Sequence, residues 1–260
     1  MVTEHRRIRS INLGERPAST EDEDELALDE PICLFVNDEY HVTLIATPEM
    51  KRELAAGYLL TQGVIDSVDE IEGVEMDDGN VKVALTGAVD LRGASVSMMN
   101  LIVTACASNP RAANTRTTVP EVSSRLRVKA SRLKDMITAL NSRSSVHRRT
   151  RGTHAAMLCG GDGDVLAFAE DVGRHNAVDK VVGAYALKGG ALGSCVLLST
   201  GRQSGEMVQK ACRVGIPVIA SMTVPLVSGV RLAERSGLTL TSMSGGQLRV
   251  YSGPQRIIVK

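Results

Sequence analysis

The densest group of polar side chains in the sequence is the block at residues 170–180, between a predicted strand and a predicted helix. Besides Asn176, it holds six ionisable side chains: Glu170, Asp171, Arg174, His175, Asp179 and Lys180. Such a block at a strand end has two interpretations. It forms a capping and salt-bridge network that holds the start of the helix, or it forms a shell of side chains that orients a ligand. The residues alone leave both open.

Thiols are the other candidates for chemistry, and the five cysteines are Cys33, Cys106, Cys159, Cys195 and Cys212. Their wide spacing and odd number predict neither a disulfide framework nor a zinc site. Four of them have apolar neighbours, which favours plain packing in the core. Cys106 differs because the segment around it, residues 105–111, continues into a polar stretch and predicts an exposed loop.

Three predicted strands near the C-terminus are followed by segments rich in Gly, Ser and Thr, at residues 200–204, 223–225 and 242–247. Ligands of open parallel sheets bind beyond the carboxyl ends of the strands. Two of these segments enter helices, whose free N–H groups favour phosphate. We therefore expect a phosphate-bearing ligand near Arg202, although an ordinary surface arginine is the alternative. The usual glycine motifs of nucleotide-binding sites are absent.

His154 begins a predicted strand, where a histidine with a purely structural role is the plainer interpretation. The residues after it lack the acid and the cysteine pair of a zinc deaminase, so no zinc is expected. A serine hydrolase is disfavoured as well, because residues 201–205 match only the second half of the nucleophile elbow.

The composition narrows the possible partners. The chain has 260 residues, of which only 2% are aromatic, and its 30 Lys and Arg balance its 30 Asp and Glu. Scarce aromatics and zero net charge weigh against a nucleic-acid partner, despite basic stretches at residues 111–132 and 143–151. No apolar run is long enough to span a membrane. The charged N-terminus does not fit a signal peptide, so a cytoplasmic location is expected.

The order of predicted elements indicates an α/β protein, with a mainly parallel sheet, helices on both faces and a smaller α+β domain before it. We divide the chain into a flexible tail (1–29), a small α+β domain (30–104), a mobile loop that carries Cys106 (105–130) and an α/β domain (131–260). Thr47 and Pro48 are expected to open the first helix as N-cap and first residue. Ser131 is expected to cap the helix that begins the larger domain.

Several of these segments together resemble the FdhD family of formate dehydrogenase accessory sulfurtransferases. The resemblance runs from about residue 29 to residue 255, and the block at residues 170–180 is its most specific part. The other matching segments are residues 29–31 with Val36 and Asn37, residues 47–48, 53–60 and 152–156, Gly201 with Arg202 and Ser204, and residues 206–210.

The resemblance implies a cytoplasmic homodimer whose larger domain is similar to the cytidine deaminase fold without its zinc. It implies that a loop cysteine accepts sulfur as a persulfide from a cysteine desulfurase. The sulfur then passes to the bis-molybdopterin guanine dinucleotide cofactor of formate dehydrogenase, in its molybdenum or tungsten form. Cys106 stands where the family has that loop, so it is the expected catalytic residue.

Contacts to this cofactor are expected from the strand-end segments and from the polar block. The expected contact residues are Ser242, Met243, Ser244, Gly245, Gly246, Gln247, Gly201, Arg202, Ser204, His154, Asp171 and His175. Neither a membrane nor a nucleic acid is an expected partner.

The sequence departs from the family pattern at two places. Asn109 replaces the second loop cysteine, so the chain is either a sulfurtransferase that uses Cys106 or a cofactor carrier that has lost sulfur transfer. Ser242 and Ser244 stand where the family commonly has an aromatic residue and an arginine, so contact with guanosine rests more on backbone groups. A nucleotide-processing enzyme on the same sheet is a third interpretation, which the missing metal motif disfavours.

Overall fold

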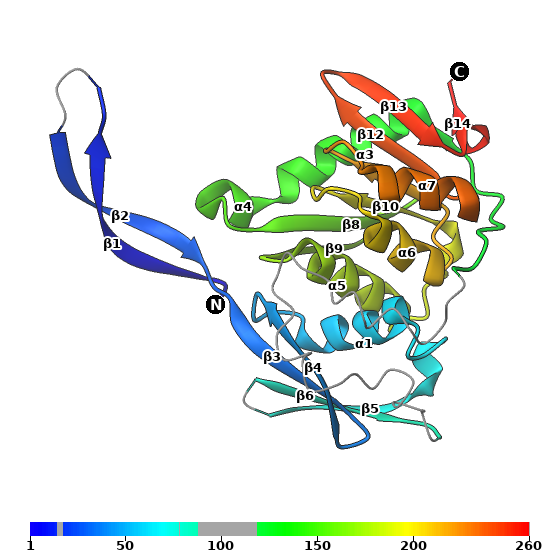
Figure 1. Ribbon diagram of the computed structural model, residues 1–260, viewed down its shortest axis with the longest axis horizontal. Helices are drawn as coiled ribbons and strands as arrows, with labels where there is room; N and C mark the ends of the chain where they lie inside the picture. The colour runs from blue at the N-terminus through cyan, green and yellow to red at the C-terminus, as the bar shows by residue number, and fades with distance from the viewer. Residues whose placement is uncertain (15–17, 78, 88–118, 260) are drawn as a thin grey trace.

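The computed structural model describes residues 1–14, 18–77, 79–87 and 119–259, and its centre is a six-stranded sheet (Figure 1). The strands lie in the order β13-β12-β11-β10-β8-β9. Their bounds are β8 (His154–Gly160), β9 (Val165–Asp171), β10 (Cys195–Ser199), β11 (Val218–Ser221), β12 (Thr239–Ser244) and β13 (Gln247–Ser252). The α-helices among the described residues are α1 (Lys51–Gln62), α3 (Ala130–Arg143), α4 (Ser145–Thr150), α5 (Arg174–Ala186), α6 (Gly205–Arg213) and α7 (Val227–Ser236).

The central sheet is mixed, so the prediction of a mainly parallel sheet is wrong. Strands β10, β11 and β12 run parallel to one another, but β8 is antiparallel to β9 and β10, and β13 is antiparallel to β12. The connections β8–β9 and β12–β13 are short turns with Gly163 and Gly245 at positive φ. Such short connections join antiparallel strands, because a parallel pair needs a long crossover. The expected likeness to cytidine deaminases stays a prediction.

Helices cover both faces of the sheet, as predicted. Successive residues of a strand point to opposite faces. Leu158 and Leu197 accordingly pack in one hydrophobic cluster with α5, α6 and α7, whereas Met157 and Val196 pack in a second cluster with α3. None of the described helices is long and apolar enough to cross a membrane.

A second, four-stranded sheet lies on the far side of α1 (Figure 1). Its order is β4-β3-β6-β5, with bounds β3 (Glu30–Val36), β4 (Glu39–Ala46), β5 (Ile71–Asp77) and β6 (Asn80–Leu85). Buried residues of this sheet, such as Leu34 and Val81, belong to the same hydrophobic cluster as Val181 of α5. The core is therefore continuous from the small sheet through α1 to the central sheet.

Helices α1 and α5 meet at two glycines. A Cβ atom at Gly57 would overlap the carbonyl group of Asp179, and one at Gly183 would overlap that of Glu53. The two backbones are therefore in direct contact, and a side chain at either glycine has to push the helices apart.

The start of α1 differs from the prediction that Thr47 and Pro48 open it. The N-cap is Met50, in the left-handed conformation at φ 55°. Thr47 is bound instead to the central sheet: its N–H donates to Asp171 Oδ2 (3.1 Å) and its hydroxyl oxygen accepts from the N–H of Val172 (3.1 Å). These long-range bonds hold Thr47 away from the helix.

The expected loop at residues 105–130 is described only from residue 119 onward, and this part lies against the body. The N–H of Val122 donates to the carbonyl of Ser236 (2.8 Å), and Arg256 Nη2 donates to the carbonyl of Val122 (3.1 Å). Strand β7 (Val128–Lys129) then pairs in parallel with β14 (Ile257–Ile258).

Helix α3 has Lys129 at its N-cap position and no side-chain cap, so Ser131 does not cap it. Cys106 and Asn109 lie outside the described residues.

Two strands of the N-terminal segment pair as a ribbon where we expected a flexible tail at residues 1–29. Strand β1 (Thr3–Asn12) pairs antiparallel with β2 (Ala18–Ala27) over their full lengths. The ribbon projects from the body next to α4 (Figure 1). The acidic run at residues 21–25 therefore lies on a strand.

We expect Gly183→Ala to lower the free energy of unfolding by about 3 kcal/mol, because the added methyl group overpacks the contact with α1. Urea denaturation measures this change. Gly73→Ala is the matched control, since a Cβ there meets nothing within 4 Å. Equal stability of the two variants would contradict the backbone contact of α1 and α5.

Candidate functional site

Three parallel strands end side by side, each with a buried serine. Ser199 of β10 is paired with Ser221 of β11, which is paired with Ser242 of β12. The Ser199 hydroxyl oxygen accepts from the N–H of Gly201 (3.0 Å), and the Ser221 hydroxyl donates to the carbonyl of Gly201 (3.1 Å). Ser199 and Ser221 thus hold the loop after β10 in place. We call this edge of the sheet, with the loops that leave it, the strand-end site.

The loop after β10 brings Arg202 and the start of α6 to the strand-end site. Gln203 is fully buried and its Nε2 donates to the carbonyl of Gly201 (2.7 Å). Ser204 caps α6, because its side chain accepts from the N–H of Met207. Arg202 lies between these anchored residues and is exposed.

His154 stands at the same edge, because β8 runs antiparallel to β10 and begins where β10 ends. Its Nδ1 lies 3.4 Å from Thr200 Oγ1. The Thr200 hydroxyl oxygen also accepts from the N–H of Ala155 (2.9 Å). His154 is therefore held by the first residue of the loop that carries Arg202.

Two arginines make the strand-end site positively charged. Partial burial is the main cause that lowers the pKa of His154, and the positive charges of Arg174 and Arg202 add to it, as does His147. The side chain of Arg174 packs closely on Gly201, because a Cβ added at Gly201 would lie 2.7 Å from the Cβ of Arg174. His154 is therefore uncharged near neutral pH, beside two permanent cations.

His175 follows Arg174 in the first turn of α5 and faces Glu206 in the first turn of α6, with 3.7 Å between Nε2 and Oε2. The Nε2 atom has no hydrogen-bond partner among the described residues. Burial, followed by the charges of Lys210, Arg174 and His154, lowers the pKa of His175 to about 3. The imidazole is therefore neutral near pH 7, and its contact with Glu206 is not an ion pair.

Asp171 is fully buried at the end of β9, and protein donors occupy its carboxylate. Lys180 Nζ lies 2.6 Å from Oδ2, and Oδ1 accepts from Gly173 N–H (2.8 Å) and Asn176 Nδ2 (3.0 Å). Lys180 also donates to the carbonyl of Thr47 (2.8 Å). Asp171 thus ties α5 to the residue that precedes α1, and it positions its neighbours instead of facing a ligand.

A second buried pair joins three helices. Lys210 of α6 lies 2.8 Å from both carboxylate oxygens of Asp179 on α5, and Thr61 of α1 donates to the same carboxylate (2.6 Å). The helix starts that carry His175 and Glu206 are therefore fixed relative to each other.

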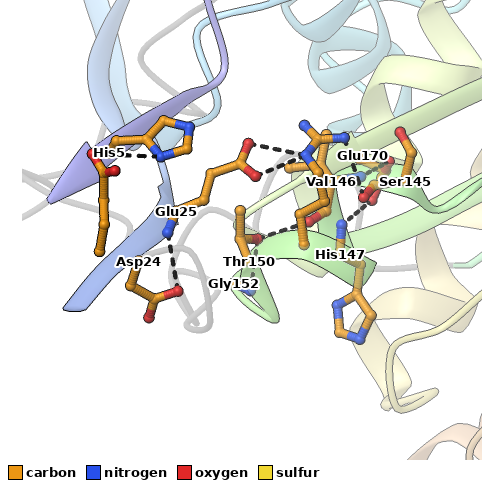
Figure 2. Close-up of polar contacts among 11 residues, drawn as sticks. His5, Asp24, Glu25, Ser145, Val146, His147, Thr150, Gly152 and Glu170 are labelled. Atoms are coloured by element: carbon orange, nitrogen blue, oxygen red, sulfur yellow. Dashed lines mark hydrogen bonds and ion pairs between the residues drawn. The ribbon is translucent and has the colours of Figure 1, made fainter. Parts of the chain in front are cut away.

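Glu170 anchors α4 next to the strand-end site (Figure 2). Its carboxylate accepts from the backbone N–H groups of Val146 (3.0 Å) and His147 (2.7 Å) and from the Thr153 hydroxyl (3.1 Å). The block at residues 170–180 therefore contains the capping and salt-bridge network, while His175 and Arg174 from the same block reach the strand-end site.

The segment at residues 242–247 is the tip of a β-hairpin. Gly245 and Gly246 make its turn at φ 58° and 76°. Ser242 is fully buried, with its hydroxyl 3.3 Å from that of Tyr251, so only the residues toward the tip are accessible. The structure brings His154, His175, Gly201, Arg202 and Ser204 to one edge.

Sequence reasoning did not select Ser199 or Ser221, and it included Thr200 and Arg174 only as members of the segment at residues 200–204 and of the block at residues 170–180. The serines left a signal, since the strands predicted at residues 195–199 and 218–222 each have one near the end. The place of Arg174 beside Gly201 could not be predicted, because it depends on the packing of α5 against the sheet.

A cavity of about 450 Å³ lies at the opposite edge of the sheet from His154, where α6 ends and β10 begins. Apolar residues and two charged ones line it: Leu60, Gly63, Ile65, Asp66, Pro120, Leu192, Arg213 and Val214. The strand-end site differs from this cavity because Arg174, Arg202 and two helix starts gather there. No three His, Cys, Asp or Glu side chains within the described ranges are grouped to hold a metal ion.

The strand-end site thus brings two arginines and the starts of two helices to one edge of an α/β sheet. The sequence model of the FdhD/NarQ family matches residues 27–258, so this chain belongs to that family and the predicted resemblance is confirmed.

Relatives and a solved structure match most of the chain. The sulfur carrier protein FdhD of Mycobacterium tuberculosis is 34% identical over 250 residues, which cover 86% of this chain and 87% of the relative. That of Thermoplasma acidophilum is 32% identical over 213 residues, covering 78% and 75%. A crystal structure described as a formate dehydrogenase accessory protein from Desulfotalea psychrophila superposes with a TM-score of 0.79 at 27% identity, covering 99% of this chain and all of that one.

The buried histidines predict how stability depends on pH. Burial lowers the pKa of His41 to about 4, and that of His175 is lowered to about 3, from an ordinary value of 6.5. Below pH 6.5 the unfolded chain binds protons that the folded chain does not, so stability falls as the pH drops toward 4. In this range each histidine lowers the free energy of unfolding by about 1.4 kcal/mol for each pH unit.

Urea denaturation at a series of pH values measures this loss. Between pH 6.5 and 5, the free energy of unfolding of His175→Gln should fall by about 2 kcal/mol less than that of the wild type. A wild-type protein equally stable throughout this range would contradict the burial of neutral histidines.

Proposed function

We propose that this chain is a sulfur carrier that accepts sulfur on Cys106 and transfers it to the bis-molybdopterin guanine dinucleotide cofactor of formate dehydrogenase. The observation that carries the proposal is membership of the FdhD/NarQ family, with sulfur carrier relatives 34% identical over 86% of the chain. The formate dehydrogenase accessory protein of matching fold supports the identity of the acceptor enzyme.

The sulfur step is an exchange at a persulfide. The Cys106 thiolate attacks the outer sulfur of a persulfide on a cysteine desulfurase, which forms a persulfide on Cys106 and leaves the desulfurase thiolate. The reaction consumes no external oxidant, because the sulfur arrives already in the persulfide state. It needs an accessible thiolate, which suits the polar segment in which the sequence places Cys106.

The cofactor is the cargo, and the strand-end site supports its binding. Its guanine dinucleotide carries phosphates, and Arg174 and Arg202 provide fixed positive charge beside the starts of α5 and α6. Free N–H groups at helix starts and arginine side chains are common phosphate partners. His154 and His175, both neutral, complete this edge as hydrogen-bonding groups without adding charge.

A cofactor carrier without sulfur transfer is the alternative function. It is favoured by Asn109, which stands where the family has a second cysteine. In that case the strand-end site still binds the cofactor, and Cys106 gains no sulfur. The homodimer, the cytoplasmic location, the cysteine desulfurase partner and the absence of zinc remain predictions.

Incubation with a cysteine desulfurase and cysteine should add one sulfur atom to the protein by intact mass spectrometry. Cys106→Ser should abolish the gain, because it removes the accepting thiolate. Cys33→Ser is the control, since this thiol is only partly exposed on β3 and contacts Thr43, so that variant should still be loaded. Failure of the wild type to gain sulfur while it binds the cofactor would favour the carrier.

Arg202→Gln should weaken the binding of guanosine diphosphate about tenfold or more, because it removes a charge-assisted phosphate contact. Isothermal titration calorimetry measures the affinity. Arg235→Gln, in the last turn of α7 and away from the strand ends, should bind as the wild type does. Equal losses in both variants would contradict a phosphate site at the strand ends.

A further inference from the structure

Positive charge is concentrated in one part of this electrically neutral chain. Residues 122–161 contain nine lysines and arginines and a single acid, Asp135. Six of these cations are exposed on α3, on α4 and at the residue that follows α4. We call these six the basic helix surface: Arg132, Lys134, Arg143, Arg148, Arg149 and Arg151.

The packing of α3 leaves its cations on the side that faces solvent. The buried side of α3, which packs on the central sheet, consists of Leu133, Met136, Ile137 and Leu140. Arg132 lies 3.9 Å from Asp135. No ion pair with another described residue engages Lys134, Arg143 or Arg151. Most of the positive charge of this surface is therefore not neutralised within the part of the chain that the structure describes.

The cations of α3 and α4 are held in one arrangement. Arg148 on α4 donates to the carbonyl groups of Asn141 (3.0 Å) and Ser142 (2.7 Å) at the end of α3. Arg149 Nε lies 2.9 Å from both carboxylate oxygens of Glu25 on β2 (Figure 2). This last contact shows that the basic helix surface binds carboxylates.

Helix α4 lies next to the strand-end site. Glu170, near the end of β9, accepts from the backbone N–H groups of Val146 and His147. His147 Nδ1 lies 2.6 Å from the carbonyl oxygen of Thr153, which precedes His154 of the strand-end site. A protein bound to the basic helix surface would therefore lie beside the site where the cargo binds.

We propose that the basic helix surface docks an acidic face of formate dehydrogenase in its cofactor-free form. The inference rests on the proposed function, because the acceptor enzyme has to approach the strand-end site to receive the cargo. Complementary charge beside that site orients the two proteins and speeds their encounter. Cations at the edge of an interface act mainly on the rate of association and on its dependence on salt.

A protein fits this surface better than a nucleic acid does. Residues 130–151 contain no Phe, Tyr or Trp, the side chains on which unpaired bases stack. The zero net charge of the chain gives no long-range attraction to a polyanion, whereas a local basic surface is enough to orient an acidic patch on a protein.

Biolayer interferometry of the full chain on immobilised, cofactor-free formate dehydrogenase tests the docking. The reversal variant Lys134→Glu, Arg143→Glu, Arg151→Glu should raise the Kd about tenfold or more at low salt, mainly through slower association. Added salt should weaken the binding of the wild type and reduce this difference. Equal binding by the wild type and the reversal variant, or no binding by the wild type, would overturn the docking surface.

A matched control variant reverses the same number of charges elsewhere. Lys188→Glu, Arg231→Glu, Arg235→Glu changes three exposed cations, on α7 and just after α5. It should bind formate dehydrogenase as the wild type does. A loss equal to that of the reversal variant would mean that net charge, and not this surface, controls the binding.

Sulfur loading separates this inference from the proposed function. The reversal variant should still gain one sulfur atom from a cysteine desulfurase, by intact mass spectrometry. Unchanged docking in a variant that is loaded would show that only the docking surface is wrong, whereas a wild type that is never loaded would contradict the proposed sulfur transfer.

Three other results would assign the surface to a different occupant and overturn the inference. One is loss of sulfur loading with intact binding of formate dehydrogenase, which would assign the surface to the desulfurase. Another is a change of oligomeric state in the reversal variant by light scattering, which would assign it to pairing between copies. The third is tighter binding of a DNA duplex than of formate dehydrogenase.

Crosslinking of the wild type gives a measurement that does not depend on the folding of variants. A carbodiimide joins a lysine amine to a carboxylate in contact with it. Peptides that link Lys129 or Lys134 to acidic residues of formate dehydrogenase are the expected products. Lys188, which is also exposed, is the internal control, and crosslinks from Lys188 alone would contradict the docking surface.

Discussion

Two buried lysines, each beside a carboxylate, organise this fold. Lys180 pairs with Asp171, and Lys210 pairs with Asp179, at 2.6 and 2.8 Å. Burial lowers the pKa of Lys180 and raises that of Asp179, in each case against the attraction of the partner. A buried ion pair adds little net stability, but the loss of one partner leaves a charge without compensation. Such pairs therefore select one arrangement of the elements that carry them.

The arrangement so selected is what creates the strand-end site. The first pair connects the end of β9 and the start of α5 to Thr47, in the small sheet's connection to α1. The second connects α5 to α6, with Thr61 of α1 as a third member. Arg174 and His175 at the start of α5 are thereby set opposite Arg202 and Glu206 near the start of α6. The positive edge depends on contacts made elsewhere in the helices.

Much of this organisation could be predicted from the sequence. The order of predicted strands and helices indicated a sheet with helices on both faces, and the segments rich in Gly, Ser and Thr indicated the strand ends as the candidate site. The mixed character of the sheet was missed. The short glycine turns between β8 and β9 and between β12 and β13 join antiparallel strands, which the alternation of strands and helices does not indicate. The bonds between Thr47 and residues 171–172 were missed because they join positions more than a hundred residues apart, beyond the range of any local pattern. Cys106 lies outside the described residues, so its role rests on the sequence and the family.

The backbone contact between Gly57 and Gly183 bears on how the chain can be divided. The small sheet covers one side of α1 and α5 covers the other, so α1 has no solvent-facing side along most of its length. A fragment of residues 1–87 would expose the apolar side of α1 that α5 normally covers. A fragment of residues 119–259 would expose the apolar side of α5 that α1 normally covers. Neither half is a self-sufficient folding unit, and the two form their helix interface only by assembling together.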